Sequence, residues 1–471
     1  MDVVLYGLYA VLAISILIPL IASREEASPR PVIALSYIAV SIYILSMTVL
    51  LYNVGGGSIE YYNGLLLHDG FSALMSLGAG VIALITLIAA SIKPAVWGTH
   101  PAYYSLLPLS LFGIFFLAGA ADLLVVLAAW LLVSVISYVI IALPDDRDSA
   151  RAAARYIYLG AVATLLLGIW IAGTVASASE IGFDSLRIAP STRTSLSGMA
   201  LVFLVAALGF KLGLVPFHWW LPSVYGRADG RAVAVVAGVV KLGFIALVTR
   251  IVYMASQRPL GFETLASGDL IAGVLAALSI ATMTYGNIAA LTPRNVQSIL
   301  AYSSIAHVGY ILAGLAALAY YNTSNPQMAR IALVGVALQS IAYGLSKSPL
   351  FTLASEAGRD ISDWRGIYAA SRSAGTGTVI LLLSLLGLPP LLGFWGKLYL
   401  FIAAAGYSII LVLIALVNSG ISSAYYIRIV REVLTGGGEA GISEEAKAAL
   451  AIAGILTVLL GLAAPIITGI I

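Results

Sequence analysis

The chain has 471 residues, of which 61% are hydrophobic and only 10% charged, and its mean hydropathy of +1.03 excludes a soluble domain and indicates an integral membrane protein. The net charge of +3 is small and dispersed, and no glycine-rich phosphate loop follows a predicted strand, so nucleic acid is not an expected partner. Because the chain has no cysteine, it cannot hold zinc or an iron–sulfur cluster through thiolates, and we expect no cofactor in this chain.

The first stretch, MDVVLYGLYAVLAISILIPLIAS, predicts a membrane-spanning helix rather than a removable signal peptide. It carries Asp2 where a signal peptide has basic residues, and it lacks a clear small-residue cleavage site. A helix needs roughly 20 apolar residues to cross the hydrocarbon, and fourteen such runs occur along the chain. Their centres lie near residues 12, 41, 81, 110, 131, 164, 206, 242, 279, 307, 341, 383, 413 and 458. We therefore predict an all-α, multi-pass protein with about fourteen transmembrane helices, embedded in the lipid bilayer of the cell membrane.

The basic residues alternate between the thirteen loops that fourteen helices would leave. The odd-numbered loops hold fifteen of them: Arg24, Arg30, Lys93, Arg147, Arg151, Arg155, Arg227, Arg231, Arg294, Arg359, Arg365, Arg372, Arg428, Arg431 and Lys447. The even-numbered loops hold five: Arg187, Arg193, Arg250, Arg258 and Arg330. Cytoplasmic loops carry the excess of basic residues. We therefore expect the odd loops to be cytoplasmic and both termini to face outside.

The seventh and twelfth predicted helices are interrupted in similar ways. The seventh reads ALGFKLGLVPFHWWLP, with Lys211 before Pro216, and the twelfth reads SLLGLPPLLGFWGKLYLF, with Pro389 and Pro390 before Lys397. Paired proline-broken helices in the two halves of a transporter indicate inverted repeats that meet at a site near the membrane midplane. The breaks therefore predict two inverted five-helix repeats, formed by helices 4–8 and 9–13.

These repeats divide a single transmembrane domain, residues 1–471, into four parts. Three N-terminal helices would occupy residues 1–95, and the first repeat residues 100–254. The second repeat would occupy residues 268–431, and a C-terminal helix residues 446–471. The longest polar connections, around 53–67, 178–194 and 353–372, are too short to fold as separate domains.

Four lysines and one histidine fall inside predicted helices: Lys211, Lys241, His307, Lys347 and Lys397. A charged lysine at the centre of a bilayer costs about 2.5–3.5 kcal/mol on insertion scales, so such residues usually face the bundle interior or a water-filled cavity. Burial disfavours the charged form of lysine and brings its proton exchange towards neutral pH, whereas arginine stays charged. These five residues therefore predict a proton relay along the membrane plane.

Each of these residues also has a structural interpretation. Lys347 and Lys397 lie near predicted helix ends, from which their ammonium groups could snorkel to the interface. Lys241, in VAGVVKLGFIALV, has long apolar sequence on both sides and is the strongest candidate. His307 could be a hydrogen-bonded helix residue, and His218, beside two tryptophans, could be an interface anchor.

The motifs around these residues resemble the antiporter-like membrane subunits of respiratory complex I. The similar stretches are GFKLGLVPFHWWLPSVY, VVKLGF, GNIAALTPRNVQSILAYSSIAHVGYIL, SLLGLPPLLGFWGKLYLF and SSAYYIRIV, within roughly residues 100–435. The N-type subunit of NADH-quinone oxidoreductase is the most similar. The resemblance implies fourteen helices with two inverted repeats, and M-, L- and K-type membrane subunits as partners. It assigns Lys211, Lys241 and Lys397 to the lysines of the seventh, eighth and twelfth helices, and His307 to the histidine of the tenth.

One position departs from the family. The family usually has a glutamate on the fifth helix as a partner for the seventh-helix lysine, and Leu131 stands there in this sequence. Asp122 begins that helix, nine residues earlier, which is about 13 Å along a helix. We therefore expect Lys211 to be neutral more of the time than in its relatives, unless a carboxylate from another helix or subunit reaches it. The first half-channel would then be altered or weakened, and the other four residues would carry most of the relay.

Three functions fit these features. The first is a proton-translocating, non-redox subunit of a complex I-like quinone oxidoreductase in a respiratory electron-transport chain. The second is a D-type subunit of a Mrp-like sodium/proton antiporter or of a membrane-bound hydrogenase. The third is a proton-silent spacer that joins neighbouring subunits. Lys241 argues against the spacer, and the missing glutamate argues for it.

Overall fold

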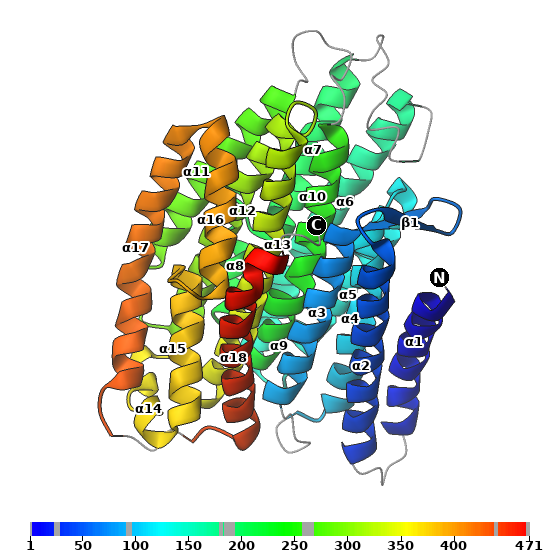
Figure 1. The fold of residues 1–471 in the computed structure, drawn as a ribbon. Coiled ribbons are helices and arrows are strands. Elements are labelled where there is room, and N and C mark those ends of the chain that lie inside the picture. Colours follow the sequence, from blue (N-terminus) through cyan, green and yellow to red (C-terminus); the bar gives the residue numbers. More distant parts are fainter. Residues whose placement is uncertain are drawn as a thin grey trace.

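The computed structural model describes residues 2–22, 29–90, 97–178, 182, 194–256, 268–437 and 441–467. Within these residues the fold is an all-α bundle of long, roughly parallel helices (Figure 1), as predicted. Five of the basic residues counted in the loops lie outside the described residues, namely Arg24, Lys93, Arg187, Arg193 and Arg258.

Twelve helices in the described part of the chain are long and apolar enough to cross a membrane. They are α1 (Asp2–Ala22), α2 (Pro29–Val54), α3 (Gly70–Ala89), α4 (His100–Gly119), α5 (Leu123–Ala142), α6 (Arg147–Ala178), the continuous run of α9 (Gly230–Ala234), η2 (Val235–Val240) and α10 (Lys241–Ala255), α11 (Gly268–Ala289), α12 (Val296–Tyr321), α13 (Pro326–Glu356), α17 (Ile409–Leu434) and α18 (Glu444–Ile467). Two short helical segments, η3 (Ile361–Trp364) and α14 (Ile367–Ala370), lie in the connection after α13.

The two predicted interruptions divide the remaining apolar stretches into pairs of shorter helices. The first pair is α7 (Thr194–Leu212) and α8 (Trp220–Tyr225), and the second is α15 (Arg372–Leu386) and α16 (Leu392–Tyr407). A glycine with positive φ ends the first helix of each pair, at Gly213 (φ 78°) and at Gly387 (φ 92°). Glycine adopts this conformation without steric cost, and the prolines that follow cannot continue a helical hydrogen-bond ladder. The breaks are confirmed, whereas the count of fourteen spans, the inverted repeats and the four-part division stay predictions.

A short antiparallel hairpin between α2 and α3 was not predicted. Strand β1 (Ser58–Tyr61) pairs with β2 (Leu66–Asp69), with Ser58 opposite Asp69. The Asp69 side chain then caps α3 by accepting a hydrogen bond of 2.8 Å from the Ser72 backbone. In Figure 1 the hairpin, labelled at β1, projects at the right-hand side of the bundle, above the end of α2.

Arg250 holds this hairpin and corrects the loop assignment made from the sequence. It lies within α10, with only 5% of its surface exposed, rather than in a loop. Its Nε donates a 2.6 Å hydrogen bond to the Ala120 carbonyl, and its Nη1 lies 3.6 Å from Asp69 Oδ2. Next to Asp69, burial and the nearby Arg250 charge lower the pKa of His68 to about 3. Through its contacts with Ala120 and Asp69, Arg250 ties the end of α10, the helix that begins at Lys241, to the hairpin.

Three of the connections that were numbered as odd loops, loops nine, eleven and thirteen, contact one another. The segment before α12 bonds to the segment after α13, through Val296 N–H to Arg359 O and Ile361 N–H to Arg294 O. Arg365 pairs with Glu432, near the end of α17, at 3.0 Å. Contacts between loops nine, eleven and thirteen agree with the alternation that the basic residues predicted.

The helix that carries Lys241 lies at the centre of the bundle. In the most apolar window of the span Gly230–Ala255, 100% of the residues are buried, compared with 28% in α1 and in α6. Glycines allow η2 and α13 to approach closely, because a Cβ on Gly344 would lie 2.8 Å from the Gly238 carbonyl oxygen. Small residues at a crossing bring helix backbones together in membranes. This crossing places Lys241 beside the middle of α13.

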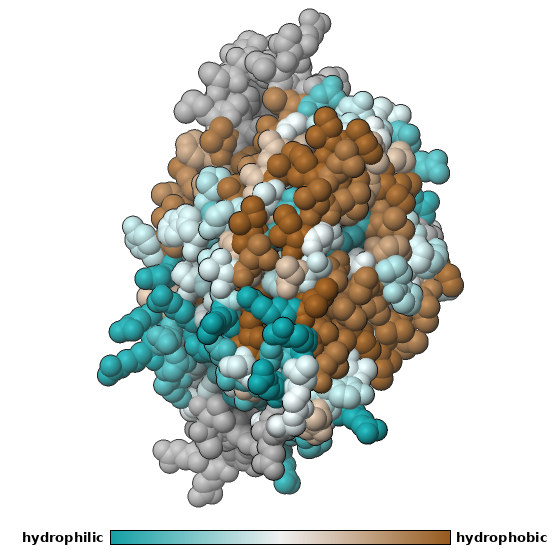
Figure 2. All heavy atoms as spheres, turned by 90° about the vertical axis from the view of Figure 1, so that its left-hand side faces the viewer, coloured by the Kyte–Doolittle hydropathy of each residue, from teal (hydrophilic) through white to brown (hydrophobic). Residues whose placement is uncertain are grey.

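The outer helices instead present apolar side chains to the surroundings. Figure 2 shows a broad hydrophobic area on the side of the bundle where α17 and α11 lie in Figure 1, with hydrophilic residues gathered towards one end. Exposed residues of α17 include Ile410, Leu413 and Val417. A surface of this kind suits lipid or the apolar face of another membrane subunit.

Candidate functional site

All five predicted relay residues are buried in the bundle interior. Lys211, Lys241, Lys347 and Lys397 expose 4%, 3%, 0% and 5% of their surfaces, and His307 exposes 2%. Lys347 lies well inside α13, and Lys397 lies one turn into α16. The interpretation that these two lysines snorkel to the interface is therefore wrong for the structure described.

A continuous run of hydrogen bonds joins Lys347 to His307. Lys347 Nζ donates to Ser303 Oγ at 2.6 Å, and Ser303 shares a very short hydrogen bond with the hydroxyl of Tyr426. The same hydroxyl lies 3.1 Å from His307 Nε2, and Gln339 Nε2 lies 2.9 Å from His307 Nδ1. Residues of α12, α13 and α17 thus form one buried path, which we call the Lys347–His307 run.

Lys241 stands next to this run without joining it. It directly follows the π-helical segment η2, a distortion that is frequent at functional sites. Its Nζ lies 5.4 Å from the ring centre of Tyr343, and Lys347 Nζ lies 5.8 Å from the same ring centre. Within the described residues Lys241 Nζ has no hydrogen-bond partner. It is the one relay candidate whose amine is both buried and unpaired there.

Lys397 occupies the second helix break. Its Nζ donates to the Leu386 carbonyl at 2.8 Å and to Ser419 Oγ at 3.0 Å. Leu386 is the last residue of α15, where the break leaves the carbonyl free of a helical partner. The ring of Tyr310 lies near both Lys397 and His307, with its centre 4.8 Å from Nζ and 5.9 Å from the imidazole centre. A broken helix therefore accommodates this lysine by supplying a backbone acceptor.

Lys211 is bound differently, because it contacts side chains rather than freed backbone. Its Nζ donates to the Tyr138 hydroxyl at 2.9 Å. No ion pair of Lys211 occurs in the part of the chain that the structure describes. Asp122 caps α5 by accepting a 2.7 Å bond from Leu124 N–H. Leu131 is 42% exposed and faces outward. Within the described residues the Lys211 amine has no carboxylate partner, but it does have a hydroxyl partner.

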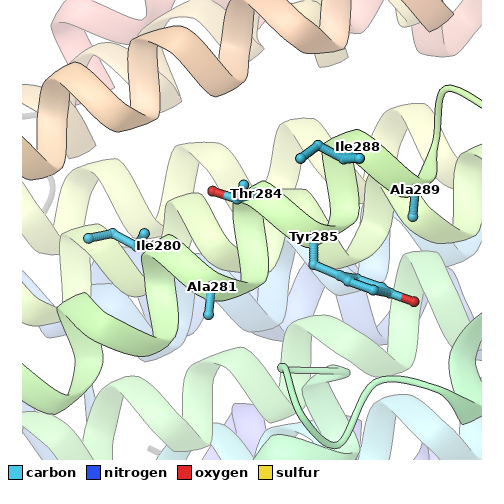
Figure 3. A pocket seen from close by; sticks show the side chains of 6 residues that line it. All are labelled: Ile280, Ala281, Thr284, Tyr285, Ile288 and Ala289. Carbon is cyan, nitrogen blue, oxygen red and sulfur yellow. The ribbon is translucent and has the colours of Figure 1, made fainter.

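His218 lies apart from the five relay residues. Its ring centre is 4.1 Å from that of Tyr285 on α11. Tyr285 also lines an apolar depression of about 460 Å³, shown in Figure 3, whose other lining residues are Ile280, Ala281, Thr284, Ile288 and Ala289. Because all six belong to the outer helix α11 and none is a relay candidate, this depression belongs to the bundle surface.

Sequence reasoning missed the hydroxyl and amide groups that connect the relay candidates. Ser303, Tyr426 and Gln339 are ordinary helix residues by sequence, and only the packing of α12, α13 and α17 brings them together. The stretch SSAYYIRIV contains Tyr426 and contributed to the family resemblance. A polar residue in an otherwise apolar span was the available signal.

Comparisons with known proteins agree with the resemblance. The sequence profile of the family described as NADH:quinone oxidoreductase/Mrp antiporter, TM matches residues 120–422, a range that contains all five relay candidates. NADH-quinone oxidoreductase subunit N of Desulfitobacterium hafniense is 31% identical over 429 residues, covering 86% of this chain and 85% of that protein. Subunit N 2 of Roseiflexus castenholzii is 33% identical over 401 residues, with coverages of 80% and 77%.

Solved structures show the same fold. A chain of respiratory complex I from Thermus thermophilus superposes with a TM-score of 0.80 at 27% identity, covering 98% of both chains. A chain of the Mrp complex from Dietzia sp. superposes with a TM-score of 0.86, covering 99% of this chain and 95% of that one. At 20% identity the second similarity concerns the fold alone.

Proposed function

Since the chain belongs to the NADH:quinone oxidoreductase/Mrp antiporter transmembrane family, we propose that it is a proton-translocating membrane-arm subunit of a complex I-like quinone oxidoreductase. The relatives named subunit N, at 31% and 33% identity over most of both chains, support this assignment. Electron transfer would take place in partner subunits, and this chain would move protons in response. Membrane subunits of the M, L and K types would be its neighbours.

The Lys347–His307 run is the observation that carries the proposal. With the Gln339 amide turned so that its Oε1 accepts from Nδ1–H, Nε2 of a neutral His307 accepts a hydrogen bond from the Tyr426 hydroxyl. A protonated Lys347 donates to Ser303, and Ser303 can donate to Tyr426, so three successive shifts move one proton from the lysine to Nε2 and leave a neutral amine and an imidazolium. The same three shifts in reverse return the proton to the lysine and leave a neutral His307. Groups of this type are suited to accept and release protons within a dry interior.

Purification and reconstitution of the native complex test the function. We expect flavin- and cluster-bearing subunits to co-purify, and quinone reduction to move protons across the membrane of sealed vesicles. Small hydrophobic partners with sodium-for-proton exchange would instead identify an antiporter. Quinone reduction without any proton movement would leave only the spacer function.

The orientation in the membrane is a second part of the proposal. The excess of basic residues in odd loops supports a cytoplasmic position for residues 145–155 and 353–372, with both termini outside. Single cysteines introduced into this cysteine-free chain can be labelled with a membrane-impermeant maleimide. We expect a cysteine at Ser362 to react only from the cytoplasmic side. Reaction only from the outer side would reverse the orientation.

A further inference from the structure

Lys211 lies inside a cage of four aromatic rings. Its Nζ is 5.4 Å from the ring centre of Trp130, 4.6 Å from Tyr138, 5.5 Å from Tyr156 and 5.1 Å from Phe244. The rings come from α5, α6 and α10, so three helices converge on one amine. All four rings are buried, and each lies within the roughly 6 Å range over which a ring face attracts a cation.

Neighbouring contacts hold the rings in place. Trp130 Nε1 donates to Thr164 Oγ1 at 3.0 Å, and its ring meets Phe244 edge to face at 5.1 Å between centres. Tyr138 meets Tyr156 edge to face at 4.7 Å. Rings fixed in this way keep their faces or hydroxyl directed at the amine without reorganising when it gains a proton.

We propose that Trp130, Tyr138, Tyr156 and Phe244 are positioning residues that stabilise the ammonium form of Lys211 in place of the carboxylate that relatives carry. This inference rests on the proposed proton-translocating function. The quadrupole of an aromatic ring attracts a cation most strongly where water is excluded, and Lys211 is only 4% exposed. A glutamate at position 131 would instead stand at a position whose side chain faces outward, since Leu131 is 42% exposed.

The cage also changes how the proton leaves. A carboxylate can accept the proton from a lysine ammonium group, whereas an aromatic ring cannot accept a proton at physiological pH. The hydroxyl of Tyr138, 2.9 Å from Nζ, is the one proton-exchanging group that Lys211 contacts by a hydrogen bond in the described chain. Phe244 lies three residues after Lys241 on α10, so the cage shares a helix with the next lysine of the relay.

The test measures the pH dependence of proton translocation in the reconstituted complex carrying Phe244→Leu or Trp130→Leu. Loss of one ring destabilises only the ammonium form of Lys211, so this lysine releases its proton at lower pH. We expect the alkaline limb of the pH profile to move down by about 0.5–1.5 pH units, which corresponds to one cation–π contact. Trp130→Phe keeps a ring and should move the limb by less than half as much.

Phe351→Leu is the matched control, because the buried Phe351 ring contacts Tyr225 rather than a lysine. An unmoved limb in both Phe244→Leu and Trp130→Leu overturns the cage, and so does an equal shift in Phe351→Leu. Lys241→Ala distinguishes a failure of the proposed relay from a failure of the cage. Normal pumping in that variant refutes the proposed relay, whereas lost pumping together with unmoved limbs refutes the cage alone.

Discussion

Replacing Lys241 by alanine should reduce redox-driven proton translocation about a hundredfold or more, the lower range of what a positioned proton-transfer group contributes. The amine is buried at the centre of the bundle, and no hydrogen-bond partner contacts it in the described chain. Removing it leaves no acceptor unsatisfied, so the complex should still assemble and hold its partners. The measurement is the number of protons moved per quinone reduced in sealed vesicles.

Two further variants complete this test. Lys241→Arg should not restore translocation, because guanidinium does not release its proton at physiological pH. Lys447→Ala is the control, since this half-buried lysine is paired with Glu444 in the first turn of α18, and its loss should leave translocation unchanged. Full pumping by an assembled Lys241→Ala complex would remove the central role that we assign to this lysine.

Replacing Tyr426 by phenylalanine should lower proton translocation about tenfold or more while keeping the ring and its packing. Only the hydroxyl is lost, and this hydroxyl joins Ser303 to His307 in the Lys347–His307 run. Without it, no described hydrogen bond connects Lys347 to the histidine. Ser303→Ala should cause a similar loss, and the double variant should lose little more than either single one, because residues that act as one path are not additive.

The neighbouring residue offers a matched control for this variant. Tyr425 is equally buried, but its hydroxyl donates to Asn287 Oδ1 at 2.9 Å, and no step of the run between Lys347 and His307 passes through it. Tyr425→Phe should therefore keep most of the translocation. If both tyrosine variants pump equally well, the Lys347–His307 run does not conduct protons.

The sequence alone determined the class of fold, the two helix breaks and the identities of the buried cations. Each of these depends on signals that are local in the chain. Apolar runs of helix length need a bilayer, and prolines interrupt a helix wherever it packs. A lysine in the middle of an apolar run, such as Lys241, can be identified as costly to bury before its neighbours in the folded structure are known.

Local sequence patterns did not predict the structural features that depend on contacts between residues far apart in the chain. The strands β1 and β2 have only four residues each, too few for a period-2 pattern to stand out in the sequence, and Arg250, which contacts the hairpin at Asp69, lies about 180 residues later. Arg250 was misplaced in a loop because a helix end and a loop have similar compositions there. Its burial becomes favourable only when Asp69 and the Ala120 carbonyl reach it.

Only the tertiary structure decided what each buried group contacts. Leu131 predicted a lysine without a carboxylate, but the ring cage around Lys211 depends on residues from three helices that pack together. In the same way, Ser303 and Tyr426 stand 123 positions apart and become neighbours only where α12 meets α17. The sequence indicates that burying these groups costs free energy, and the packing of distant helices determines which neighbouring groups offset that cost.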